Sequence, residues 1–220
     1  MALKSKQFWL VFAMSSLSIL FGYYTVDIYK VFGQTNELLN HDAYLTWVGS
    51  LGSVCTSLRF LWSAALDHLP YRLIYGVLLS MQIALACTMS FAVRSQTTYL
   101  VWICLALFCE GGHFTIVPNT LKKTFGEQAT SLYGFMLTYT GFSSLALIVL
   151  LETKLGKSYI EFYLVAAGCS LMALILLILA FDESKFVYDP DQLKAAVKKR
   201  LKKTSDSQLF GSAKSSAIKQ

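Results

Sequence analysis

Six apolar stretches, each about as long as a bilayer is thick, divide this chain of 220 residues. They cover residues 8–33, 44–66, 72–93, 98–121, 131–151 and 159–181. Because an α-helix rises 1.5 Å per residue, about 20 residues cross the roughly 30 Å hydrocarbon core of a bilayer. The pattern predicts an all-α polytopic membrane protein whose six transmembrane helices form one bundle over residues 1–181. The first stretch is longer than the apolar core of a signal peptide, so we expect it to remain as a span.

Composition supports a membrane protein and locates most of the charge outside the apolar stretches. Hydrophobic residues make up 55% of the chain and charged residues 15%, and the mean hydropathy of +0.52 exceeds what one soluble core requires. The net charge of +6 comes mainly from residues 182–220, which we expect to form a basic, partly disordered cytoplasmic tail. Because this charge reports membrane topology, we expect no nucleic-acid partner.

The distribution of Lys and Arg between the connecting segments predicts the orientation. An even number of spans places both termini on one side of the membrane. The segments on that side carry Lys4, Lys6, Arg72, Lys122, Lys123 and the basic tail, whereas the other side carries Lys30, Arg94, Lys154 and Lys157. Cytoplasmic loops are enriched in Lys and Arg, so we expect a multi-pass protein with both termini in the cytoplasm. The sequence does not distinguish the plasma membrane from an organelle.

Motifs for metal, nucleotide or hydrolytic chemistry do not occur in the sequence. The five cysteines are odd in number and form no CxxC, so neither a disulfide framework nor a zinc site is predicted. No GxxxxGK[ST], HExxH or GxSxG is present. We therefore predict a protein that is not an enzyme and needs no metal or cofactor, and any transport is expected to be secondary-active or facilitated.

Arg59 stands inside the second apolar stretch, where a charged side chain is costly unless it faces protein or water. Its planar guanidinium can donate two parallel hydrogen bonds to a carboxylate, and a dry cavity strengthens that pairing. Two hypotheses remain open. Arg59 contacts an anionic substrate, or it has a structural role, bound to a carboxylate on another helix such as Glu110 or to backbone carbonyls.

Glu110 and His113 are the candidates for proton coupling. Glu110 lies near the middle of the fourth stretch and is followed by Gly111-Gly112, which we expect to loosen the helix, and by His113. A carboxyl group at this depth can hold a proton and release it when water or a cation approaches. The alternatives are that Glu110 is a permanent partner of Arg59 and that His113 is a hydrogen-bonded packing residue.

Two further patterns concern packing. Asp27 lies three residues before Lys30, and an i,i+3 ion pair between them explains both residues without a functional role. Small residues are expected where helices approach closely. They include Gly49 and Gly52 in the second stretch and Gly134 and Gly141 in the fifth.

The segment from Arg59 through Trp62 and Asp67 to Arg72 resembles the short charged loop of the major facilitator superfamily. The resemblance implies that Asp67 and Arg72 belong to a charge lock between helix ends that holds one conformation. Leu69 and Pro70 replace the glycine-containing turn of the family. The alternative is a polar turn in which Asp67 caps the third helix.

A longer set of motifs resembles the oxalate/formate antiporter and monocarboxylate transporter branch of that superfamily. The tenth and eleventh helices of that branch are similar to a first set of motifs: Phe108-Cys109-Glu110-Gly111-Gly112-His113-Phe114 with Pro118, Phe125-Gly126, Tyr133-Gly134 and Gly141. The seventh helix of that branch is similar to a second set: Gly22-Tyr23-Tyr24 with Tyr29-Lys30 and Phe32-Gly33. The resemblance covers residues 8–181 and implies the carboxy-terminal six-helix half of a twelve-helix carrier. An arginine eight residues before the loop aspartate contacts the substrate in that branch. The resemblance therefore implies a substrate site at Arg59, Tyr23 and Tyr24.

The function implied is a secondary-active or facilitated transporter, by antiport or symport, or the carboxy-terminal half of one. A small organic anion such as a monocarboxylate is the expected substrate, because the fifth stretch adds no Lys or Arg to Arg59. Membrane lipid and a second six-helix bundle are the expected partners, the bundle being an amino-terminal half or a second copy. The alternatives are a non-transporting accessory or interaction protein of the membrane and a carrier of a neutral solute.

Overall fold

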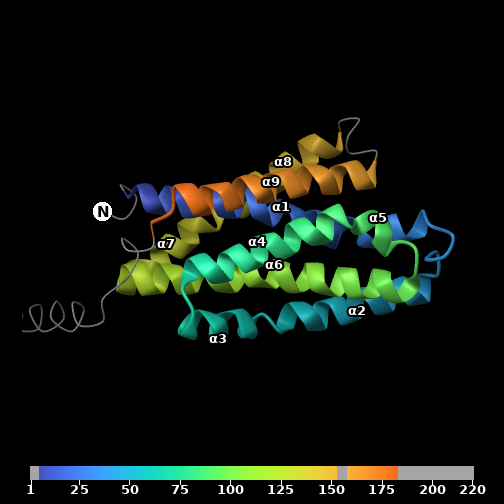
Figure 1. Cartoon of the computed structure of the whole chain (residues 1–220), viewed down its shortest axis with the longest axis horizontal. Helices are drawn as coiled ribbons and strands as arrows, with labels where there is room; N and C mark the ends of the chain where they lie inside the picture. The colour runs from blue at the N-terminus through green and yellow to red at the C-terminus, as the bar shows by residue number, and fades with distance from the viewer. Residues whose placement is uncertain (1–4, 153–157, 183–220) are drawn as a thin grey trace, which may run out of the picture. The chain divides into compact units, whose positions relative to one another are not determined.

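The computed structural model describes residues 5–152 and 158–182, and the predicted tail from residue 183 onward lies outside the described residues. The described residues form helices and no strand (Figure 1). The helices are α1 (Lys6–Gln34), α2 (Asp42–Ser57), α3 (Phe60–His68), α4 (Tyr71–Cys87), α5 (Met89–Ala92), α6 (Gln96–Phe125), α7 (Ala129–Met136), α8 (Thr138–Leu151) and α9 (Tyr159–Leu179), with a 3₁₀ turn at Gly126–Gln128.

Four segments of the described chain are long and apolar enough to cross a membrane. They are Lys6–Gln34, Gln96–Phe125, Ala129–Val149 and Tyr159–Leu179, and they correspond to the first, fourth, fifth and sixth predicted stretches. The second stretch is divided between α2 and α3, and the third between α4 and the short α5. The all-helical, membrane-length character of the chain is therefore confirmed, whereas six spans in one major facilitator bundle remain a prediction.

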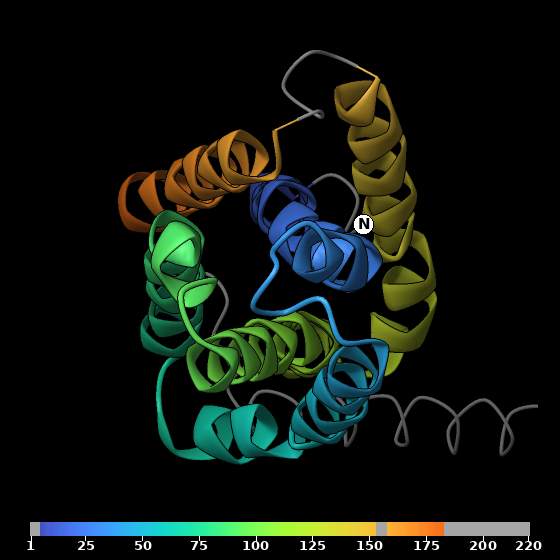
Figure 2. The same cartoon turned by 90° about the vertical axis from the view of Figure 1, so that its right-hand side faces the viewer.

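α1 packs against α6, α8 and α9, and Figure 2 shows these helices on different sides of it. Ser18, Ile19, Leu20, Phe21 and Gly22 are consecutive and all buried, so every side of α1 is covered at this level. α4 packs along α9, and α2 packs along α6. α8 instead exposes a set of large apolar side chains: Phe142, Leu145, Ile148 and Val149.

Aromatic rings fill the interface between α1 and α9. Tyr24 stacks on Phe162 with ring centroids 3.7 Å apart and meets the edge of Tyr163 at 5.0 Å. Phe32 lies 5.2 Å from Tyr159 in the same interface. Lipid chains are as apolar as these rings, so close packing and ring geometry stabilise this contact more than removal from water does.

The aromatic interface predicts that Phe162→Ala destabilises the protein. The substitution removes the ring on which Tyr24 stacks and leaves a cavity, so we expect the free energy of unfolding to fall by on the order of 2 kcal/mol or more. Unfolding of the purified protein in detergent, followed by circular dichroism, measures this loss. Leu164→Ala is the matched control, because Leu164 is 52% exposed on the same helix. Equal losses for the two variants would contradict a stabilising role of the aromatic interface.

Candidate functional site

The second predicted span is interrupted at Arg59, which immediately precedes α3. The backbone N–H of Arg59 donates to Thr56 O at 3.1 Å. In the next turn, Leu61 N donates to Leu58 O at 2.9 Å, and Trp62 N donates to Arg59 O at 3.1 Å. These i to i+3 bonds are of the 3₁₀ type, which is tighter than the α-helix and often marks a hinge when it occurs within a helix. The Arg59 side chain is exposed on the surface of this chain.

A stripe of hydroxyl side chains runs along α2 toward this break. It consists of Thr46, Ser50, Ser53 and Ser57, all exposed, and each donates to the carbonyl four residues earlier at 2.8 to 3.0 Å. Side-chain bonds of this kind weaken and bend a helix, which agrees with the interruption that follows. Polar side chains in membrane-length segments normally face protein or water. The hydroxyl stripe therefore indicates a side of α2 that does not face lipid.

α3 is held against α6 by specific contacts. The Trp62 ring stacks on Phe108 with centroids 5.0 Å apart, and its Nε1 donates to Phe108 O at 3.1 Å. About three turns after Phe108 on α6, Asn119 Nδ2 donates to Ser63 Oγ of α3 at 2.7 Å. These contacts fix the backbone of α3 directly after Arg59.

Gly111 and Gly112 let α6 approach the break closely. A Cβ added at Gly111 would lie 2.8 Å from Thr56 O and 3.2 Å from Arg59 Cβ, and one added at Gly112 would lie 3.0 Å from Trp62 Nε1. The expectation that this pair loosens the helix is wrong, because α6 continues through both glycines. The two glycines instead allow α6 to pack closely against the residues on either side of the break.

Glu110 lies where α6 meets α1, and it is 9% exposed. A Cβ added at Gly22 of α1 would lie 2.7 Å from Glu110 Cγ, so glycine provides the space for this side chain. Arg59 is near enough to act electrostatically on the Glu110 carboxyl group. Within the described residues, however, no carboxylate oxygen lies within 4.0 Å of the Arg59 guanidinium. Arg59 and Glu110 are therefore neighbours that do not form a closed ion pair.

Tyr23 joins this cluster from α1. It is close enough to interact with Glu110 and with Thr140 of α8, and its ring centroid lies 6.5 Å from that of Phe114. Tyr133 of α7 interacts electrostatically with both Arg59 and Tyr23. The sequence analysis did not select Tyr133 and Thr140. Tyr133 lies on α7 and Thr140 on α8, so the periodicity of a single helix did not identify them as neighbours in the site.

Two of the residues predicted for the site lie elsewhere in the structure. Tyr24 is fully buried between α1 and α9, stacked on Phe162, and so points away from Arg59. His113 is fully buried and contacts α4: its Nε2 lies 3.0 Å from Gln82 Nε2, and its ring meets the edge of Tyr75 at 5.8 Å. His113 and Glu110 are one turn apart on α6. The contacts of His113 fit the alternative that it is a hydrogen-bonded packing residue.

Asp67 and Arg72 form no ion pair with each other, and each is linked to the end of another helix. Asp67 Oδ1 lies 3.3 Å from Lys123 Nζ, at the end of α6, and Lys123 also donates to Leu66 O. Arg72 Nη2 donates to Ile178 O at 2.7 Å. The structure therefore links α3 to α6 through Asp67, and α4 to α9 through Arg72.

Lys30 pairs with Asp42 across α1 and α2, at 2.7 Å. The expected pair with Asp27 is therefore replaced by one between helices. Asp27 is exposed and acts electrostatically on Tyr23.

Small residues divide into two groups. Gly49 faces the Tyr29 hydroxyl and Gly52 faces Leu107, so the expectation of close packing is confirmed for the second stretch. Gly134 and Gly141 have no atom of the described chain within 4 Å of an added Cβ, so that expectation is wrong within this chain. These two glycines lie on an open surface.

The described cluster contains polar and charged groups and has no arrangement typical of a metal site. In the described residues, no group of three or more His, Cys, Asp or Glu side chains is arranged to hold a metal ion. The five cysteines are free. What the cluster offers is an exposed guanidinium, a nearby carboxyl group and two tyrosine hydroxyls, which can together bind a carboxylate and respond to a proton.

Comparison with known proteins gives one distant relative. No protein-family model matches the chain. The chain is 24% identical over 131 residues, or 58% of its length, to apicoplast pyruvate carrier 1 of Toxoplasma gondii, and the match spans 24% of that carrier. The relative is a carrier by name, which agrees with the prediction of a non-enzyme. The chain therefore matches only part of a protein that is named as a carrier of pyruvate, and the superfamily and branch remain predictions.

The close approach at Gly111 predicts opposite effects for two glycine substitutions. Gly111→Ala brings a methyl group against Thr56 O and Arg59 Cβ, so we expect a loss of about 1–3 kcal/mol in the free energy of unfolding. Gly168→Ala on α9 meets nothing within 4 Å and gains helix propensity, so stability should stay constant or rise by up to about 1 kcal/mol. Unfolding in detergent measures both. A Gly111→Ala variant as stable as Gly168→Ala would contradict the close contact at the break.

Proposed function

We propose that the protein acts in the secondary-active or facilitated transport of a small monocarboxylate, with Arg59 as the residue that contacts the carboxylate. The observation that carries this proposal is that the Arg59 side chain is exposed at a helix break and forms no ion pair within the described residues. Glu110 is its electrostatic neighbour. A structural arginine in a membrane protein is instead expected to have its partner in contact. The relationship to a pyruvate carrier supports the same substrate class.

The guanidinium favours a carboxylate over a neutral solute. A guanidinium donates two parallel hydrogen bonds to a carboxylate, and one fixed positive charge suits one negative charge. Tyr23 and Tyr133 supply hydroxyls beside it that can bind a second oxygen of the substrate. These groups would orient a small 2-oxo acid or a similar monocarboxylate.

Glu110 gives a physical basis for coupling to protons. When Glu110 is ionised, its charge offsets that of Arg59, and when it binds a proton the charge of Arg59 is left for an anion. Anion and proton then favour one another's binding by the same factor, as thermodynamic linkage requires. We propose Glu110, and not His113, as the coupling residue, because His113 faces Gln82 and Tyr75.

A second bundle completes the proposed carrier. Carriers with binding sites at the midplane place them between two halves that move against each other. The open surface around Gly134 and Gly141, together with the exposed apolar residues of α8, supports contact with another bundle on this side. The hydroxyl stripe of α2 would then line the path between the halves. We propose an organellar membrane on the basis of the relative's name, with both termini on the cytoplasmic side.

Uptake of pyruvate into proteoliposomes that contain the full chain tests the role of Arg59. We expect saturable uptake, with Arg59→Gln losing roughly 10- to 100-fold in apparent affinity, because a hydrogen bond to a charged group contributes about 1.5–3 kcal/mol. Arg59→Lys should lose less, because it keeps the charge and loses the planar fork.

The control is Arg94→Gln, since Arg94 is exposed and lies 5.4 Å over the Phe91 ring, outside the cluster. Its uptake should equal that of the unmodified chain. Unchanged affinity in Arg59→Gln would contradict the substrate contact. No uptake by the unmodified chain would contradict transport by this chain alone and favour an accessory role.

The ion pair of Asp67 and Lys123 is proposed as the charge lock. Asp67→Lys and Lys123→Asp should each change the uptake rate severalfold, because an exposed pair contributes about 0.2–1 kcal/mol, and the double variant should restore it. Lys122→Asp is the control for Lys123→Asp, because it makes the same change in net charge at an adjacent exposed position. Failure of the double variant to recover would contradict the lock.

A further inference from the structure

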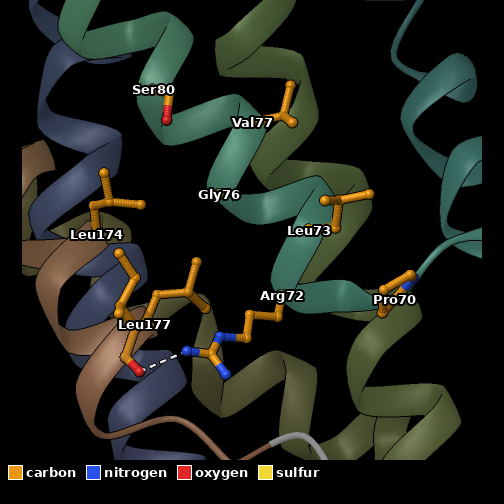
Figure 3. Close-up of a pocket in the computed structure, with 9 residues that line it drawn as sticks. Pro70, Arg72, Leu73, Gly76, Val77, Ser80, Leu174 and Leu177 are labelled. Carbon is orange, nitrogen blue, oxygen red and sulfur yellow. Dashed lines mark hydrogen bonds between the residues drawn. The ribbon is translucent and has the colours of Figure 1, made fainter.

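A groove of about 630 Å³ lies between α4 and α9 (Figure 3). Its lining includes Leu73, Gly76, Val77 and Ser80 of α4, and Leu174 and Leu177 of α9. Apolar side chains make up most of the lining. None of the described lining residues belongs to α1, α3, α6 or α7, so the groove is separate from the Arg59 cluster.

Small side chains on α4 make this groove hollow. Gly76 and Ser80 are one helical turn apart and therefore share a face. A Cβ added at Gly76 would meet only Leu177 Cδ2, at 3.7 Å, which is ordinary van der Waals contact. Packing of α4 on α9 thus does not require glycine here, and the missing side chain leaves space for an occupant.

The length of the groove matches one leaflet of a bilayer. Its lining on α4 runs from Pro70 to Ser80, which corresponds to about 15 Å at 1.5 Å per residue. The hydrocarbon core of a bilayer is about 30 Å thick, so the groove extends over roughly half of it. An acyl chain of one leaflet fits this apolar length.

Arg72 stands at one end of the groove, where α4 begins. Its Nη2 donates to Ile178 O at 2.7 Å, which draws the guanidinium toward α9, as Figure 3 shows. A guanidinium has five N–H donors, so one such bond leaves donors for a phosphate. Among the described residues that line the groove, Arg72 carries the charge and none is acidic. The charge at the end and the apolar length together match an anionic lipid.

We propose that the groove between α4 and α9 binds an anionic glycerophospholipid, with one acyl chain along Gly76 and Ser80 and the phosphate at Arg72. The predicted orientation puts Arg72 at the cytoplasmic end of α4, and the cytoplasmic leaflet is the one rich in anionic lipids. Binding at this groove does not depend on the transport proposal. The lipid would bridge the start of α4 and the end of α9.

Retention of lipid by the purified full chain tests the proposal. The protein is equilibrated in detergent with equal amounts of phosphatidylglycerol and phosphatidylcholine, and the retained lipids are counted by native mass spectrometry. We expect severalfold preference for phosphatidylglycerol. Arg72→Gln should remove the preference, whereas Lys122→Gln, which removes an exposed charge outside the groove, should keep it. Gly76→Leu should lower retention of both lipids by filling the groove.

Ser80→Leu fills the other end of the groove and is the second variant if Gly76→Leu does not fold, with helical content checked by circular dichroism. Arg72→Lys should keep part of the preference, because it keeps the charge. If Arg72→Gln and Lys122→Gln lost the preference for phosphatidylglycerol equally, general surface charge would explain the preference. That result would contradict a phosphate site at Arg72. Unchanged retention in folded Gly76→Leu or Ser80→Leu would overturn occupancy of the groove.

Discussion

The cost of placing a guanidinium among membrane-length helices constrains the structure more than any other single interaction. Arg59 cannot face hydrocarbon without a partner or water, and its helix does not continue through it. The backbone changes to 3₁₀ hydrogen bonds at Thr56 and Arg59, and the helix resumes as α3. Arg59 therefore lies at a helix break, with its side chain exposed on the surface of the described chain.

Several packing contacts surround Arg59 and the helix break. The glycine at 111 lets α6 come within contact of the break, and Gly22 makes room for Glu110 beside α1. The stacking and hydrogen bond of Trp62 on Phe108 anchor α3 immediately afterwards. The result is a guanidinium and a carboxyl group that act on each other electrostatically and form no ion pair within the described residues. An arrangement of this kind can respond to a substrate or a proton, whereas a closed ion pair has already satisfied both charges.

Hydrophobic patterning predicted the helical character of the described chain and four of the membrane-length segments, because bilayer thickness sets a minimum length for an apolar span. The second and third predicted stretches are each divided between two helices. The same pattern could not predict the break at Arg59, which depends on hydroxyl bonds to the α2 backbone and on the approach of α6. Arg59 and Glu110 were identified from residue type and position and Tyr23 from the family resemblance, and in the structure Glu110 interacts electrostatically with both of the others. Tyr24 was misjudged because adjacent residues on a helix face different directions, about 100° apart. The ion pair of Lys30 was predicted with the wrong partner, because Lys30 pairs with Asp42 on another helix, which local sequence does not reveal. The sequence likewise did not identify Lys123 as the partner of Asp67.

Competition for pyruvate binding to the purified chain is the most direct test of the central claim that Arg59 recognises a carboxylate. Labelled pyruvate is bound at equilibrium and displaced either by acetate, which keeps the carboxylate, or by methyl pyruvate, which keeps the carbon skeleton and loses the charge. The account predicts displacement by acetate and at least roughly tenfold weaker displacement by the ester, since the charged hydrogen bonds are lost. Equal displacement by the neutral ester would contradict recognition of the carboxylate by Arg59.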